Sequence, residues 1–178
     1  PGRPTKGLPR VIQRIYIIRM DSDRYSIYMR LALREAEQAF EEGEVPVGAV
    51  VVQGDRVIGR GANRTVHLHD ATAHAEMIAL TAAANALGDW RLEGCELYCT
   101  LEPCAMCAGA AVLSRIERIV FGSRDPKFGA CGSIFLIPGD PRLNHRAEIV
   151  EGVLADAAAE LMRAFFQRLR QAKGEEVT

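Results

Sequence analysis

Two short stretches constrain the fold of this chain more than any other feature, because their side chains are suited to bind one metal ion together. They are His74-Ala75-Glu76 and Pro103-Cys104-Ala105-Met106-Cys107. A zinc ion held by three protein groups, here one imidazole and two thiolates, keeps a further position open for water or substrate. The donor set therefore predicts a catalytic zinc centre with one Zn²⁺ per chain, and the fold has to bring the two stretches to one point.

The spacing within each stretch predicts its local structure. Cys104 and Cys107 are three positions apart, so both sulfurs lie on one face of a helix if Pro103 opens it. The start of a helix also favours thiolates, the form that binds metal. His74 and Glu76 are two positions apart and would diverge in the middle of a helix, so we expect them at a helix start, with Asp70 or Thr72 as the cap.

The cysteine pair taken alone has other interpretations. Cys-x-x-Cys also occurs in redox pairs and in structural zinc sites, and Cys99 is the nearest candidate for a fourth ligand. The apolar positions 97, 99 and 101 alternate with Tyr98 and Thr100, however, which predicts a strand with Cys99 on its apolar face. The joint pattern H-x-E…P-C-x-x-C is the signature of zinc-dependent nucleobase deaminases, in which the Glu moves protons and does not bind the metal. We therefore assign as metal ligands His74, Cys104 and Cys107, and as the catalytic residue Glu76.

The size and composition of the chain limit its class. Its 178 residues, 48% of them hydrophobic, suffice for one buried core and are too few for two ordinary domains. The five cysteines are an odd number and two are assigned to the metal, which argues against a disulfide framework and predicts a cytoplasmic location. No apolar run approaches the roughly 18 residues that span a membrane. The net charge is −1, so nucleic-acid binding would require locally clustered basic groups.

The first residues differ from the rest of the chain. Residues 1–19 carry five basic side chains and no acidic one. We interpret them as a basic extension that is disordered or not native to the protein, with Met20 as the working start; a transit peptide and an RNA-contacting arm remain alternatives. Residues 20–173 are then a single zinc deaminase domain, and residues 174–178 a polar tail.

Hydrophobic periodicity predicts helices that alternate with strands. We expect a helix capped by Ser22 or Asp23 that runs to about Glu42, a hairpin of strands at 47–52 and 56–61, and a helix at 74–87. A strand at 96–101, a helix at 103–114, strands at 119–122 and 148–150, and a helix at 156–173 follow. This order is typical of an α/β sheet that is covered on both faces.

Several longer stretches resemble one family closely. They are Glu44-Val-Pro-Val-Gly-Ala-Val50, Gly61-Ala-Asn63-Arg64, His69-Asp-Ala-Thr-Ala-His-Ala-Glu76, Thr100-Leu-Glu-Pro-Cys-Ala-Met-Cys-Ala-Gly-Ala110 and Asn144-His-Arg146. From about residue 24 to residue 172 the chain is similar to bacterial tRNA-specific adenosine deaminases. The resemblance implies a three-layer αβα cytidine-deaminase-like fold with a central mixed sheet, and a homodimer. It also implies that the substrate is a tRNA anticodon loop, chiefly of an arginine tRNA, in which adenosine at the wobble position becomes inosine.

The resemblance also implies substrate contacts. Asn63 matches the side chain that reads the flipped base, Asp125 matches a residue near the target ribose, and Phe166 and Arg168 fall on a C-terminal helix that flanks the anticodon loop. The residues alone leave simpler roles open, because Asn and Asp are common in turns, adjacent Phe residues often pack in a core, and Arg often covers a solvated face. The chain departs from the family at Ala71, where most members have Pro.

Two other functions share parts of this pattern. A small-molecule deaminase acting on guanine or cytosine would use the same zinc core, and phosphate contacts from Arg124, Lys127, Arg142 and Arg146 would favour RNA instead. The second alternative is a non-catalytic scaffold subunit. The presence of Glu76 argues against it, because a structural zinc site does not require a proton shuttle. The expected chemistry is hydrolytic, with Glu76 acting first as base and then as acid.

Overall fold

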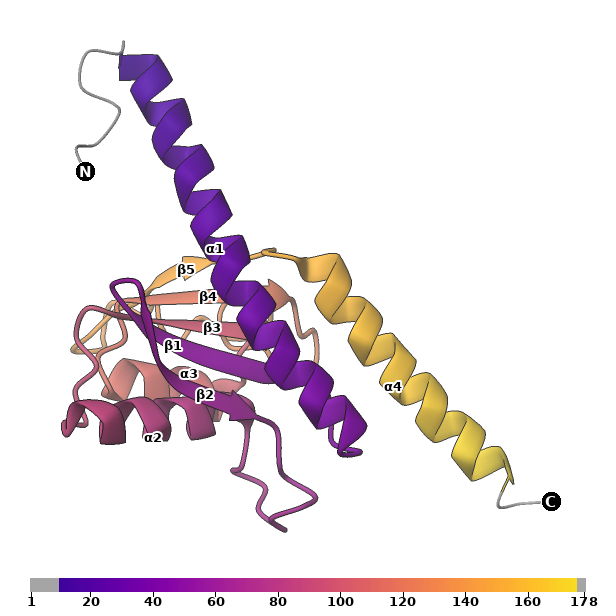
Figure 1. The fold of residues 1–178 in the computed structure, drawn as a ribbon. Coiled ribbons are helices and arrows are strands. Elements are labelled where there is room, and N and C mark those ends of the chain that lie inside the picture. The colour runs from indigo at the N-terminus through magenta and orange to yellow at the C-terminus, as the bar shows by residue number, and fades with distance from the viewer. Residues whose placement is uncertain (1–9, 176–178) are drawn as a thin grey trace.

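A five-stranded mixed sheet with helices on both faces forms the body of the protein (Figure 1). The computed structural model describes residues 10–175, with side chains described for residues 23–172. The strand order is β2-β1-β3-β4-β5, in which β1 pairs antiparallel with β2 and β3, while β3, β4 and β5 are parallel. In chain order the elements are α1 (Arg10–Glu41), β1 (Gly48–Gln53), β2 (Arg56–Ala62), α2 (Ala75–Leu87), β3 (Cys95–Leu101), α3 (Ala105–Leu113), β4 (Arg118–Ser123), β5 (Glu148–Val150) and α4 (Ala155–Glu175). The expected three-layer αβα architecture is confirmed.

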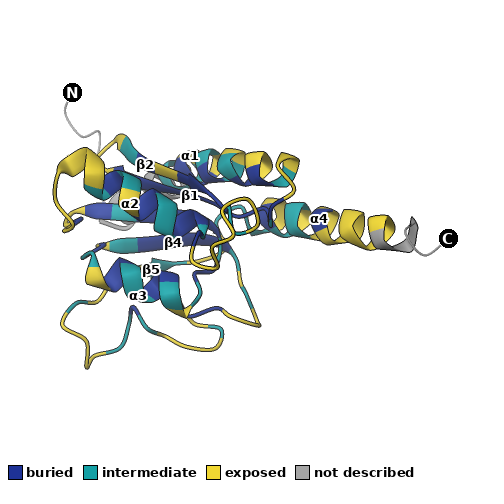
Figure 2. Cartoon of the chain, turned by 90° about the horizontal axis from the view of Figure 1, so that it is seen from below, coloured by how far each residue is buried: buried dark blue, intermediate teal, exposed yellow. Residues whose placement is uncertain are grey.

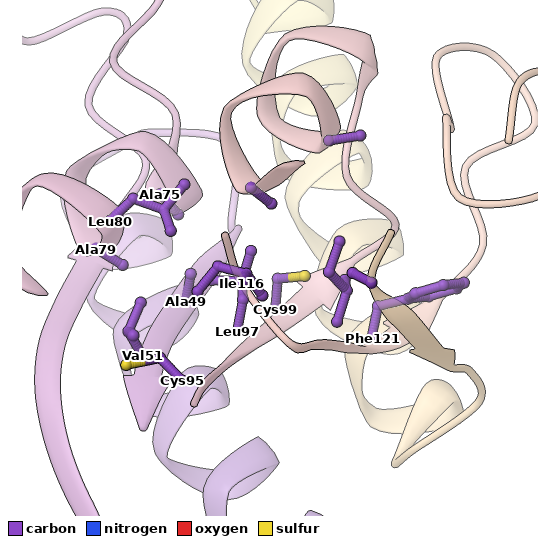
Figure 3. Close-up of a cluster of buried hydrophobic side chains, with 14 of the residues drawn as sticks. Ala49, Val51, Ala75, Ala79, Leu80, Cys95, Leu97, Cys99, Ile116 and Phe121 are labelled. Atoms are coloured by element: carbon purple, nitrogen blue, oxygen red, sulfur yellow. The ribbon is translucent and has the colours of Figure 1, made fainter. Parts of the chain in front are cut away.

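Alternation along the strands builds the core on both faces of the sheet. Ala49 and Val51 of β1 pack with residues of α2 and α3, whereas Val50 and Val52 pack on the side of α1. Figure 3 shows the first cluster, in which Leu97 and Cys99 of β3 lie among these side chains. Strands β1, β3 and β4 are largely buried, while the distal part of α4 is exposed (Figure 2).

Helix α2 lies unusually close to the backbone of β2. A Cβ atom added at Gly61 would lie 2.1 Å from the carbonyl oxygen of Ala75, and one added at Gly59 would lie 2.2 Å from that of Ala79. Because glycine has no Cβ, the first turn of α2 can rest directly on the strand. This close approach sets the position of the helix start that carries His74 and Glu76.

The first helix begins earlier than expected. It starts at Arg10 and not at Ser22 or Asp23, because residues 10–41 contain neither Gly nor Pro to interrupt it. Part of the segment interpreted as an extension is therefore continuous with α1. Residues 1–9 of that segment, and residues 176–178 of the polar tail, lie outside the described residues.

The remaining predicted elements agree with the structure to within two residues at each end. Cys99 lies on β3 as expected, is fully buried, and its Sγ donates to the carbonyl oxygen of Val120 at 3.7 Å. Among the helices in residues 10–175, none combines the length and the hydropathy needed to cross a membrane.

Candidate metal centre and active site

The candidate site lies at one edge of the sheet, where several chain segments meet. Strand β3 ends there at Leu101, and β1 begins there because it runs antiparallel to β3. Strand β2 ends at the same edge, since Gly48 pairs with Ala62. Helices α2 and α3 both start there, so the sheet topology brings together residues that are about 30 positions apart in the sequence.

The two helix starts hold the predicted ligands. His74 is the N-cap of α2, with an extended backbone at φ −73° and ψ 151°, and Cys104 is the N-cap of α3. Cys107 follows in the first turn of α3 and is fully buried. The expected capping by Asp70 or Thr72 is wrong: the Oδ1 atom of Asp70 instead accepts hydrogen bonds from the backbone N–H and hydroxyl of Thr72, both at 2.7 Å.

The spacing of the three ligand atoms fits a zinc ion. The Nδ1 atom of His74 lies 3.7 Å from Sγ of Cys104 and 3.6 Å from Sγ of Cys107. Around a tetrahedral zinc ion with Zn–N of about 2.1 Å and Zn–S of about 2.3 Å, nitrogen and sulfur lie about 3.6 Å apart. Among the described residues these three form the one group of His, Cys, Asp or Glu side chains close enough to share an ion. Cys99 is therefore not a ligand, and three protein donors leave a tetrahedral ion one open position.

Electrostatics at the helix starts favour a metal-binding thiolate. A hydrogen bond from the Cys107 thiol, together with one from His74, lowers the pKa of Cys104 to about 4. The same bond and burial raise the pKa of Cys107. The hydrogen bond with Cys104 raises the pKa of His74. The lowered pKa of Cys104 agrees with a role as a metal ligand, since metals bind the thiolate.

Glu76 is buried next to the ligands but is not one of them. Its side chain is 3% exposed, and its Oε2 atom has no hydrogen-bond partner among the described residues. Burial raises its pKa to about 7. A buried oxygen without a hydrogen-bond partner lowers the stability of the fold. Its retention indicates a group that binds a substrate or a water molecule.

A cavity of about 360 Å³ opens beside Glu76. It is lined by Val45, Val47, Asn63, Thr65, His74, Glu76, Leu101, Glu102, Cys104, Asp125 and Phe128. Asn63 and Asp125 therefore join the metal ligands and Glu76 in one site. A mostly apolar cavity of this size with a few converging polar groups is typical of a small-ligand site.

The residues predicted on α4 do not line this cavity. Phe166 is 43% exposed and packs edge-on against Phe165, with ring centroids 5.5 Å apart. Arg168 lies over the ring of Phe40 at 5.2 Å. Phe165 is the buried member of the pair, at 4% exposure, and contacts Phe40 of α1.

Glu44, which sequence reasoning did not single out, holds Asn63 in place. Its carboxyl group is 1% exposed and accepts from Nδ2 of Asn63 at 3.2 Å and from the backbone N–H of His67 at 2.7 Å. Thr65 and the backbone N–H of Val66 also donate to it, at 3.3 and 3.2 Å. Nδ2 of Asn63 donates to Glu44 and to Thr65, so both amide hydrogens of this cavity-lining side chain are already engaged.

Glu102, the second residue that sequence reasoning missed, anchors the loop after β4. It is 2% exposed and accepts from the backbone N–H groups of Asp125 and Cys131 at 3.0 Å each, and of Ser133 at 2.9 Å. The hydroxyl of Ser133 donates to the same carboxyl group. Both glutamates lie inside stretches that carry the family resemblance. That resemblance was the only feature of the sequence that could have indicated their importance.

The basic residues considered for phosphate contacts are partly engaged already. Arg124 pairs with Glu151, and Arg142 pairs with Asp140, whereas Lys127 and Arg146 are exposed. His145 has a structural contact, since its Nε2 lies 2.6 Å from the carbonyl oxygen of Ile116.

Comparisons with known proteins agree with this geometry. Residues 22–123 match the family profile of the cytidine and deoxycytidylate deaminase zinc-binding region. The chain is 49% identical over 147 residues to the tRNA-specific adenosine deaminase of Bacillus subtilis, covering 83% of this chain and 91% of that protein. It is 49% identical over 143 residues to that of Aquifex aeolicus, covering 80% and 94%.

Solved structures of deaminases also superpose on this fold. A structure from studies of A-to-I editing by tRNA:A34 deaminases at the wobble position of transfer RNA superposes with a TM-score of 0.73 at 46% identity, covering 75% of this chain and 97% of that one. A guanine deaminase from Nitrosomonas europaea superposes with a TM-score of 0.69 at 27% identity, covering 79% and 83%.

Proposed function

Since this chain belongs to the tRNA-specific adenosine deaminases, within the zinc-binding cytidine and deoxycytidylate deaminase family, we propose that it converts adenosine 34 of a tRNA anticodon to inosine by zinc-dependent hydrolysis. The observation that carries this proposal is the arrangement of Glu76, which has a buried oxygen without a partner and lines a cavity together with His74 and Cys104. The identity of 46–49% with tRNA adenosine deaminases, against 27% with the guanine deaminase, favours the RNA substrate.

The residues divide the chemistry between them. His74, Cys104 and Cys107 would hold the zinc ion, which when bound would supply the Lewis acidity that makes water a nucleophile near neutral pH. Glu76 takes a proton from the attacking water as the C6–O bond forms and passes it to the ring nitrogen N1. It then takes the second proton from the new C6 hydroxyl and passes it to the amino group, which leaves as ammonia when the C6–N bond breaks. The products are inosine and ammonia.

The cavity requires an unstacked base. C6 of adenine is inaccessible within a helix, so the substrate has to be a loop nucleotide that turns out of its stack, as the anticodon allows. In this proposal Asn63 contacts the edge of the base and Asp125 contacts the ribose; both residues line the cavity, which supports these roles. Phe166 and Arg168 contact the anticodon stem or loop from α4, outside the cavity.

Membership of the same family supports a proposal for the assembly and location. We place the protein in the cytoplasm with its tRNA substrate, and we expect a homodimer. The consecutive side chains Ile134, Phe135 and Leu136 are 46%, 56% and 54% exposed, and exposed apolar groups of this kind are typical of an interface. Sedimentation at micromolar concentration tests the dimer, and a monomer would contradict it.

The test of the activity is incubation of the purified zinc protein with an arginine tRNA that carries A34. We expect inosine at position 34 and none in the same tRNA with G34. Free guanine and cytosine serve as competing substrates, with ammonia as the readout. Ammonia release from a free base without inosine formation in tRNA would overturn the proposal.

A further inference from the structure

Phe128 is a large apolar side chain in an unusual position. It is 70% exposed, yet it lines the same cavity as Glu76, Asn63 and Cys104. It belongs to the loop after β4, and it has no role in metal binding or proton transfer. An exposed aromatic ring at the wall of a catalytic cavity is available to a ligand and contributes little to the core.

The loop holds Phe128 firmly despite its exposure. The Oδ1 atom of Asp125 accepts from the backbone N–H of Lys127 at 2.9 Å and of Phe128 at 3.3 Å. Gly129 follows directly and packs against Glu102, where an added Cβ would lie 2.4 Å from the carboxyl group. The backbone on both sides of the ring is therefore fixed, so a ligand that contacts Phe128 has only the side-chain torsions of the ring to order.

The chemistry around the ring favours a nucleobase. A cavity of about 360 Å³ has room for the target base, so the neighbouring nucleotides must remain at its mouth, where Phe128 is exposed. The Oδ1 atom of Asp125 accepts from the backbone N–H of Phe128, and a carboxylate so near disfavours a phosphate, which leaves the uncharged face of a base as the group that fits there. Bases stack on aromatic side chains in single-stranded RNA recognition.

Resting on the proposed function, we propose that Phe128 is a stacking residue that binds the base of one nucleotide flanking the target adenosine. The contact contributes to RNA affinity and not to the chemical step. Stacking of one base on one aromatic ring corresponds to about 5- to 150-fold in affinity.

The experiment measures how Phe128 and the flanking bases depend on each other. Zinc-loaded wild type and Phe128→Ala are titrated with three anticodon stem-loops, one intact and two with a single abasic nucleotide, either 5′ or 3′ of the adenosine. We expect Phe128→Ala to weaken binding of the intact stem-loop about 5- to 150-fold, and to have less than a twofold effect on one of the two abasic forms. An equal loss on all three, or no loss on the intact form, would overturn the proposal.

Three further variants separate stacking from other effects. Phe128→Tyr should retain affinity, and Phe128→Leu should lose it, because leucine is apolar but has no π face. Trp90→Ala removes another exposed aromatic side chain, at the opposite edge of the sheet before β3, and should leave affinity unchanged. Inosine formation is measured separately on the intact stem-loop. Its absence would reject the deaminase assignment, whereas the binding series would still decide the role of Phe128.

Discussion

Replacing Gly61 by Ala should damage the zinc site from a distance. The added Cβ would lie 2.1 Å from the carbonyl oxygen of Ala75, the residue between His74 and Glu76. Because real Cβ atoms essentially never approach other atoms within 3.0 Å, the first turn of α2 has to retreat by about 0.9 Å. Metal ligands tolerate displacements of only about 0.2 Å, so His74 can no longer share an ion with both cysteines in good geometry.

The expected size of the effect follows from this displacement. Zinc affinity should fall about 10- to 100-fold, as it does when the support of a ligand is removed. Deamination should fall at least about 100-fold, since a shift of about 1 Å in a catalytic group has that effect. Overpacking also lowers the free energy of unfolding by about 1–3 kcal/mol.

Gly48→Ala is the matched control. A Cβ at Gly48 would lie 2.1 Å from the carbonyl oxygen of Ala32, so the same clash falls on α1, which carries no metal ligand. This variant should lose about 1–3 kcal/mol of stability while its zinc affinity stays near that of the wild type. Chelator competition measures zinc affinity and denaturant unfolding measures stability. Wild-type zinc affinity in Gly61→Ala, or equal zinc loss in both variants, would refute the reasoning.

Three further predictions concern the catalytic group, the support of Asn63 and the RNA. Glu76→Gln should keep zinc but reduce inosine formation by about 10²- to 10⁴-fold, and turnover within tenfold of wild type would remove Glu76 from the proton-transfer role. Glu44→Gln should lower the free energy of unfolding by about 1.5–3 kcal/mol, because the buried carboxamide cannot accept from all four donors; an unchanged denaturation midpoint would mean that this network contributes nothing. Binding of the tRNA should weaken steeply as salt rises from 50 to about 200 mM, measured by filter retention, whereas a flat dependence would point to a free-base substrate.

Local spacing was sufficient to predict the structure of each half of the metal centre, and the joint motif predicted that the halves meet. The interval between His74 and Glu76 is compatible with shared chemistry only at a helix start, and that between Cys104 and Cys107 puts both sulfurs on one helix face; α2 and α3 begin at these residues. Alternation of apolar residues likewise predicted the strands and the buried position of Cys99. These inferences succeeded because they depend on residues within one or two helical turns of each other.

Other features depended on contacts between distant parts of the chain. Glu44 and Glu102 look like ordinary surface carboxylates in the sequence, and their donors lie 19–31 positions away. The exposure of Phe128 within the cavity, and the position of Phe166 outside it, were equally invisible. Hydrophobic periodicity determines which element a residue joins. The register of the sheet and the packing of α2 on the glycines of β2 determine which elements meet at the edge of the sheet. Both depend on contacts between residues that are far apart in the sequence.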